Sequence, residues 1–176
     1  MEPRVEYSAP WGRSVRWITG LVTGGILVLG VTLLVLTDRP QNQVAVGLTF
    51  LFVVLIFGGT AGFAVRGYRL VPGGLEIQRP GWTTRISLAG LSQVEKAPGM
   101  FQGFGIKVGN GGFLGFVGWF WTHSEGWFRA WVTDPKRAIR LRFPDRVVVV
   151  SPDDPDAFLV ALQRLRSFSV NSERLR

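Results

Sequence analysis

Two long stretches without a charged residue lie near the start of the chain. Residues 17–37 read WITGLVTGGILVLGVTLLVLT, and residues 44–65 read VAVGLTFLFVVLIFGGTAGFAV. As helices, each would span roughly 30 Å, the thickness of the hydrocarbon core of a bilayer. Neither stretch shows the polar stripe of a soluble bundle helix, and the first is too long for the core of a signal peptide. Because the polar linker 38–43 is short, the pattern predicts two transmembrane helices, 17–37 and 44–65, in an antiparallel hairpin.

The charges beside these stretches predict how the hairpin is oriented. Cations lie before the first stretch and after the second: Arg4, Arg13, Arg16, Arg66 and Arg69. The linker holds one arginine beside one aspartate. By the positive-inside rule both termini, including the N-terminal segment 1–16, are cytoplasmic, and the chain is a multi-pass protein of the cell (plasma) membrane.

Glycines recur at GxxxG spacing in both stretches, as Gly20 and Gly24 and as Gly58 and Gly62. Small residues let helix backbones approach closely in lipid, where hydrophobicity does not drive association. Two interpretations stay open: these glycines pack the two helices of the hairpin together, or they form the contact of a homo-oligomer.

The pattern changes after residue 65 to short runs that alternate apolar and polar residues, separated by Pro, Gly and Asp. Seven such runs predict strands at 68–71, 75–79, 82–87, 91–95, 127–133, 138–143 and 146–150. A helix is predicted at 154–166, because Ser151 to Pro155 supply capping residues and Phe158, Leu162 and Leu165 recur at helical spacing. The predicted β domain therefore covers 66–168 and leaves a polar tail at 169–176.

Seven strands closed by a C-terminal helix resemble a pleckstrin-homology (PH) fold. The stretches that carry the resemblance are YRLVPGGLEI, WTTRISLAGLSQVE, FRAWVTDPKRAIRLRF and VVVVSPDDPDAFLVAL, within residues 67–166. The order of the parts is similar to that of bacterial PH-like proteins in which a membrane hairpin precedes the domain. The resemblance implies an α+β membrane protein, with a transmembrane α-hairpin before an antiparallel β-barrel or sandwich and its C-terminal helix.

Residues 98–128 combine frequent glycines with many aromatic residues. Such a stretch is typical of a long loop or of two irregular strands bent at glycines. The aromatic side chains have three interpretations. They fill the barrel core, they enter the membrane interface with Trp119, Phe120 and Trp121 as candidates, or they form a surface for a partner protein.

Composition narrows the chemistry. The chain has no cysteine and a single histidine, His123, and no carboxylate pair is spaced for catalysis, so we expect no enzyme activity, no metal site and no cofactor. The 20 Lys+Arg against 12 Asp+Glu give a net charge of +8. For a chain held in a bilayer the nearest polyanion is the lipid headgroup layer, so we expect no nucleic-acid partner.

These observations predict a membrane-anchored binding or scaffold module that docks on anionic lipid headgroups at the cytoplasmic face. The candidate headgroup ligands are the arginines that follow the second stretch: Arg66, Arg69, Arg79 and Arg85. The alternative is a module that binds or regulates another protein of a membrane complex and has no lipid specificity.

Overall fold

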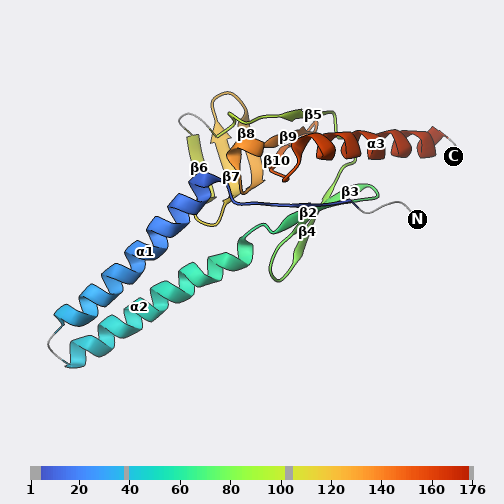
Figure 1. Cartoon of the computed structure of the whole chain (residues 1–176). Helices are drawn as coiled ribbons and strands as arrows, with labels where there is room; N and C mark the ends of the chain where they lie inside the picture. Colours follow the sequence, from blue (N-terminus) through green and yellow to red (C-terminus); the bar gives the residue numbers. More distant parts are fainter. Residues whose placement is uncertain (1–4, 38–39, 102–104, 175–176) are drawn as a thin grey trace.

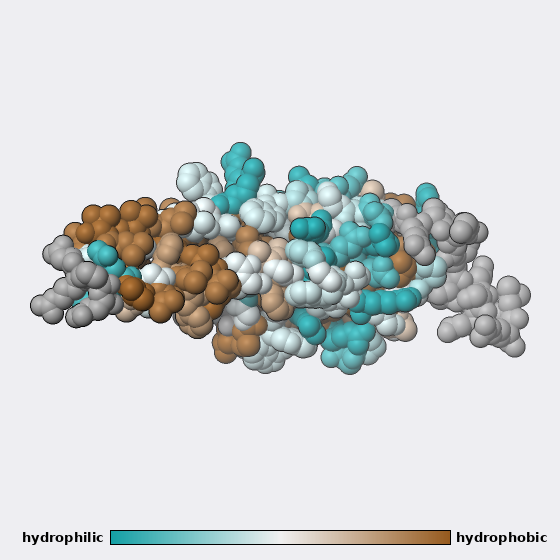
Figure 2. Space-filling view, turned by 90° about the horizontal axis from the view of Figure 1, so that it is seen from below, coloured by the Kyte–Doolittle hydropathy of each residue, from teal (hydrophilic) through white to brown (hydrophobic). Residues whose placement is uncertain are grey.

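The computed structural model describes residues 5–37, 40–101 and 105–174, and it contains a helical hairpin joined to a domain of two sheets (Figure 1). The hairpin consists of α1 (Arg13–Leu36) and α2 (Pro40–Thr60), and a short 3₁₀ helix, η1 (Ala61–Phe63), extends α2. Both helices are long and apolar enough to cross a membrane. Most of their side chains are exposed, and hydrophobic surface gathers on the hairpin while hydrophilic surface covers much of the domain (Figure 2).

The hairpin is packed at one point that the glycine pattern did not predict. Gly30 of α1 is buried against the ring of Phe50 on α2, where a Cβ atom would collide with that ring. A Cβ atom at Gly20, Gly24 or Gly58 would meet no atom within 4 Å. The interpretation that these three glycines pack the hairpin is therefore wrong, and a homo-oligomer through them stays a prediction.

The smaller sheet contains a strand from the N-terminal segment. Its order is β1 (Val5–Ser8), β2 (Gly67–Val71), β3 (Gly74–Gln78) and β4 (Thr83–Ser87), all antiparallel. The meander β2–β3–β4 confirms the alternation seen in the sequence. β1 pairs with β2 from Val5↔Leu70 to Ser8↔Gly67, so residues 5–8 of the predicted N-terminal segment 1–16 form part of the β domain.

The larger sheet has six strands in the order β5-β9-β10-β8-β7-β6. Their bounds are β5 (Gln93–Lys96), β6 (Gly105–Gly111), β7 (Phe116–Thr122), β8 (Gly126–Val132), β9 (Ile139–Arg142) and β10 (Val147–Val150). β10 lies between β9 and β8 and runs parallel to β8. Every other strand pair in the domain is antiparallel, as the predicted fold implies, and this pair is the exception among the described strands.

Two clusters of buried residues hold the sheets in place. The first fills the space between the sheets with side chains such as Tyr68, Leu75 and Leu141, and Phe158 and Leu162 of α3 (Pro155–Arg174) close it. The second covers the other face of the larger sheet. Its members include Phe116, Phe120 and Phe128, and Phe101 packs against all three rings.

The start of α3 confirms the predicted capping. The Asp154 carboxylate accepts hydrogen bonds from the backbone N–H groups of Asp156 (3.1 Å) and Ala157 (3.0 Å). These are two of the N–H groups that a helix leaves unpaired at its first turn. At its other end α3 continues to Arg174, beyond the predicted end at 166 and into the predicted tail 169–176.

The glycine-rich stretch forms the hairpin β6–β7, and its aromatic side chains divide between the two faces of the sheet. Phe120 is 2% exposed in the second cluster, whereas Trp119 is 44% exposed on the opposite face beside a half-buried Trp121. Successive residues of a strand point to opposite faces. The three residues therefore do not enter one interface together, and the prediction is wrong for Phe120.

A buried tyrosine joins the two sheets. Tyr68 Oη donates to Trp131 O (2.6 Å) and accepts from Ser151 N (3.1 Å). We expect Tyr68→Phe to lower the free energy of unfolding by about 1–3 kcal/mol, because two buried backbone groups lose a partner. Chemical denaturation of the full chain in detergent measures this loss.

The second tyrosine of the chain is the matched control. Tyr7 Oη forms no hydrogen bond with any described residue, so Tyr7→Phe is expected to change the free energy of unfolding by less than about 0.5 kcal/mol.

Burial raises the pKa of Tyr68 to about 12. Because the unfolded tyrosine loses its proton first, the stability from Tyr68 is complete below pH 10 and falls as the pH rises toward 12. Equal stability of Tyr68→Phe and Tyr7→Phe would contradict this role.

Candidate functional site

The candidate site lies where the helical hairpin joins the domain. Residues on both sides of the hairpin are buried in the domain, Val15 in the second cluster and Val65 in the first. Gly12 N, at the start of α1, donates to Thr133 O at the end of β8 (2.9 Å). Val15, in the first turn of α1, is fully buried in the second cluster. The first turn of α1 therefore belongs to the domain, and it holds the residues around it in fixed positions.

The turn between β6 and β7 reaches both helices. Leu114 N donates to Thr19 Oγ1 of α1 (2.9 Å), and the ring of Phe113 lies edge-on to Phe57 of α2, with centroids 5.4 Å apart. Contact with both helices fixes the hairpin to the larger sheet at their domain ends.

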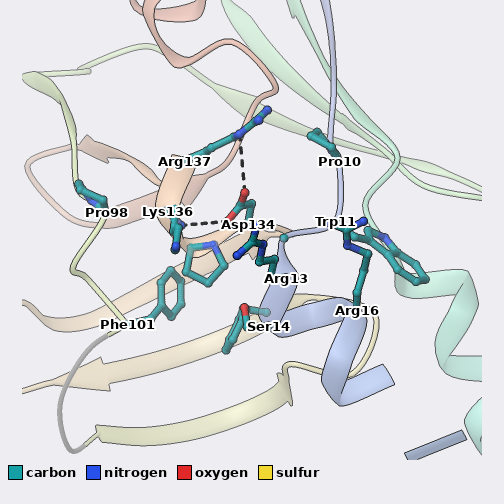
Figure 3. A pocket seen from close by; sticks show the side chains of 13 residues that line it. Pro10, Trp11, Arg13, Ser14, Arg16, Pro98, Phe101, Asp134, Lys136 and Arg137 are labelled. Carbon is teal, nitrogen blue, oxygen red and sulfur yellow. Dashed lines mark hydrogen bonds and ion pairs between the residues drawn. The ribbon is translucent and has the colours of Figure 1, made fainter. Parts of the chain in front are cut away.

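A cleft of about 930 Å³ opens beside the start of α1 (Figure 3). We call it the α1 cleft. Its walls come from the segment before α1 and its first turn, the segment after β5, and the turn that follows β8, where η2 (Pro135–Arg137) lies. The side chains labelled in Figure 3 include Trp11, Arg13, Arg16, Phe101 and Lys136.

Positive charge in the α1 cleft is not compensated. Asp134 is the one carboxylate among the described residues that line it; this group accepts from Lys136 N (3.1 Å) and lies 3.6 Å from Arg137 Nε. The side chains of Arg13, Arg16 and Lys136 are exposed and form no ion pair with any described residue. These three cations, next to an exposed Trp11, are suited to hold an anionic surface or group.

Two of the four predicted arginines, Arg69 and Arg85, lie on one face of the smaller sheet, on either side of Glu76. Arg66 is exposed at the start of β2, without an ion pair to a described residue. Arg69 pairs with Glu6 and, at 3.8 Å, with Glu76 across neighbouring strands, and Arg85 donates to Pro72 O (3.2 Å). Arg79 lies between the two sheets. Arg69 is thus paired with acids, and the other three form no ion pair with a described residue; that the four bind headgroups stays a prediction.

Sequence reasoning missed Lys136, and it used Arg13 and Arg16 only to orient the hairpin. A signal for Lys136 was present, since Asp134-Pro135 predicted a turn that would expose the next cations. The sequence does not show that β1 pairs with β2 or that Gly12 N donates to Thr133 O. These two contacts bring residues 13 and 136 to one cleft.

The described residues also show what surrounds the lone histidine. His123 is exposed in the turn between β7 and β8, with its ring 6.1 Å from that of Trp121. Among the described residues no three His, Asp or Glu side chains gather in a way that would hold a metal ion.

The comparison with sequence families gives a match over residues 66–166 with the bacterial PH domain. This covers more than half of the chain. The chain belongs to the bacterial PH domain family. The PH domain as matched contains β2 to β10 and most of α3, but it leaves out β1 and the hairpin. No curated protein and no solved structure matches the chain.

The α1 cleft lies across the N-terminal boundary of the PH domain match. Phe101, Lys136 and Arg137 lie within the matched residues, and Arg13 and Arg16 lie outside them. The cleft is therefore made jointly by the PH domain and the helix that precedes it. A PH domain without this helix would lack two of the three uncompensated cations.

Proposed function

We propose that this protein is a membrane-anchored PH module that docks on anionic lipid headgroups at the cytoplasmic face of the cell membrane. The observation that carries the proposal is the set of uncompensated cations, Arg13, Arg16 and Lys136, at the domain end of an apolar helix. Each cation close to an anionic leaflet contributes about 1 kcal/mol.

Membrane insertion of α1 and α2 is supported by their length and by their exposed apolar side chains. A removable leader is disfavoured for α1 because β1, which precedes it, forms part of a sheet. A soluble helical hairpin would bury one face, and these helices bury almost none. With Arg13 and Arg16 in the first turn of α1 and Arg66 after η1, both termini face the cytoplasm.

Hydrogen exchange of the full chain in lipid nanodiscs tests the docking. The amides of residues 11–14 and 136–138 are expected to exchange more slowly when phosphatidylglycerol is added to phosphatidylcholine. The difference should shrink as salt rises, because exposed charges are screened. The double variant Arg16→Gln, Lys136→Gln should lose most of this difference in exchange between the two lipid compositions.

A control variant removes the same charge elsewhere. Arg142 and Arg146 flank the β9–β10 turn, at the opposite end of these strands from Thr133. Arg142→Gln, Arg146→Gln should therefore keep the lipid dependence. Equal exchange in both kinds of disc at low salt would overturn the proposal.

The alternative function, binding of a protein partner, has one observation in its favour. The face of β6, β7 and β8 that carries Trp119 also exposes Ile106, Val108 and Trp127, which are large apolar side chains. Exposed apolar patches are typical of interaction surfaces. A protein recruiter of this kind would show no dependence on anionic lipid in the exchange experiment, so the same measurement separates the two functions.

A further inference from the structure

A second opening, of about 320 Å³, lies between the two sheets and is separate from the α1 cleft. We call it the inter-sheet opening. It is lined by the end of α2 and η1, by the turn after β3, and by residues of β6, β7 and β8. Thr60 and Phe63 place one side of it at the domain end of the apolar hairpin.

Of the described residues that line the inter-sheet opening, two are arginines and none is an acid. Arg79 Nε is buried and has no hydrogen-bond partner among the described residues. Arg129 is exposed, and it has no ion pair within the described part of the chain. Burial, and then the charge of Arg129, lower the pKa of Arg79. A guanidinium group that is partly desolvated and faces a like charge is costly to the fold unless an anion completes the site.

Aromatic rings hold both guanidinium groups. Arg129 lies between Trp131 and Trp119, at 4.6 Å and 5.5 Å from their ring centroids, and Arg79 lies 5.8 Å from that of Trp82. Such stacking orients a guanidinium without neutralising its charge. The N–H groups therefore stay available for an oxyanion, and the planar fork suits two oxygens of one phosphate.

The surroundings favour a lipid over a soluble anion. Phe63 and Trp82 pack edge-on with centroids 5.1 Å apart, and both are about half exposed beside the opening. In the proposed orientation they lie at the cytoplasmic membrane interface, where aromatic side chains are enriched. They would contact the glycerol and upper acyl region of a lipid whose phosphate enters the opening.

We infer that the inter-sheet opening is a binding site for one phospholipid, whose headgroup phosphate is held by Arg79 and Arg129. The inference rests on the proposed membrane placement but not on docking through the α1 cleft. It differs from that docking in being stoichiometric and in requiring a phosphate group.

Native mass spectrometry of the full chain in maltoside detergent tests the site. With phosphatidic acid added, one lipid per chain is expected to remain bound, and diacylglycerol, which lacks the phosphate, is expected to leave no adduct. Arg79→Gln should weaken lipid retention by about tenfold, as expected when one charge-assisted contact is lost. Retention equal to that of the native chain would overturn the site.

Thermal unfolding without added lipid guards against a simple folding defect. If Arg79 only supported the fold, Arg79→Gln would lower the unfolding temperature. As a ligand group with an unpaired charge, it should leave that temperature unchanged or raise it. A lower unfolding temperature would contradict the inference.

Two further arms separate the alternatives. The α1-cleft variant Arg16→Gln, Lys136→Gln should keep the bound phosphatidic acid, and its loss there would assign the lipid to the α1 cleft instead. Inorganic phosphate at millimolar concentration should not displace the lipid. Displacement would identify a site for a soluble anion and overturn the assignment to phospholipid.

Discussion

A chain made of residues 66–176 alone is expected not to fold cooperatively, although it contains the whole family match. It lacks β1, which hydrogen-bonds to β2 along four residue pairs. It also lacks Tyr7, whose ring packs edge-on against Phe158 at 5.0 Å, and Val15, which is buried in the second cluster. Loss of large core side chains costs about 3–5 kcal/mol each, and the unfolding free energy of a domain is only about 5–15 kcal/mol.

The measurement is thermal unfolding followed by circular dichroism, and the control restores only the missing strand. Ala9 N lies 3.1 Å from Arg66 O, so β1 ends close to where β2 begins. Residues 1–12 joined to 66–176 by a short Gly/Ser linker should therefore regain a cooperative transition without the hairpin. A transition in residues 66–176 at the same temperature as in the linked chain would show that β1 is dispensable.

The features predicted correctly are those encoded by neighbouring residues. The apolar stretches, the alternation in β2 to β4 and the Asp154 cap each follow from contacts within a few positions, which periodicity and capping rules describe. The family resemblance is confirmed by the match over residues 66–166. The predicted strand bounds differ from the observed ones by only one or two residues.

The features that were missed depend on pairing between distant segments. β1 is only four residues long, and although Val5 and Tyr7 alternate with Glu6 and Ser8, its partner strand lies about 60 positions later in the chain. The parallel pair β8–β10 requires that β10 insert between β8 and β9, which no local pattern shows. Arg140 of β9 pairs with Glu95 of β5 and with Glu125 in the turn before β8, and no local pattern shows these ion pairs either.

The candidate site shows the same division. The sequence shows that positive charge lies near the hairpin. It does not show which arginines form ion pairs with acidic side chains. Arg69 is neutralised by acids on neighbouring strands, while Arg13 and Arg16 keep their charge. Assigning Trp119 and Phe120 to one surface was avoidable, because strand alternation already separates neighbouring residues.

A single added methyl group in the β6–β7 hairpin is expected to have one of the largest effects on the fold. Gly118 has φ +144°, and a Cβ atom there would lie 2.5 Å from Val108 O and 2.9 Å from Gly109 Cα. Gly109, its cross-strand partner, has φ +139°. Because the obstacles are backbone atoms, no side chain can turn away to relieve them. The positive φ alone costs a non-glycine residue about 1–3 kcal/mol.

Gly118→Ala is therefore expected to lower the free energy of unfolding by about 3 kcal/mol or more in the full chain in detergent. Gly81→Ala is the control, since no atom lies within 4 Å of a Cβ atom there and its φ is not positive. The effect should extend beyond stability, because this hairpin carries the turn that contacts α1 and α2 through Leu114 and Phe113. Limited proteolysis should then cut between the helices and the larger sheet at a protease concentration that leaves the Gly81→Ala chain intact. If both variants unfold together and resist protease equally, the close approach of β6 and β7 is not what couples the helical hairpin to the PH domain.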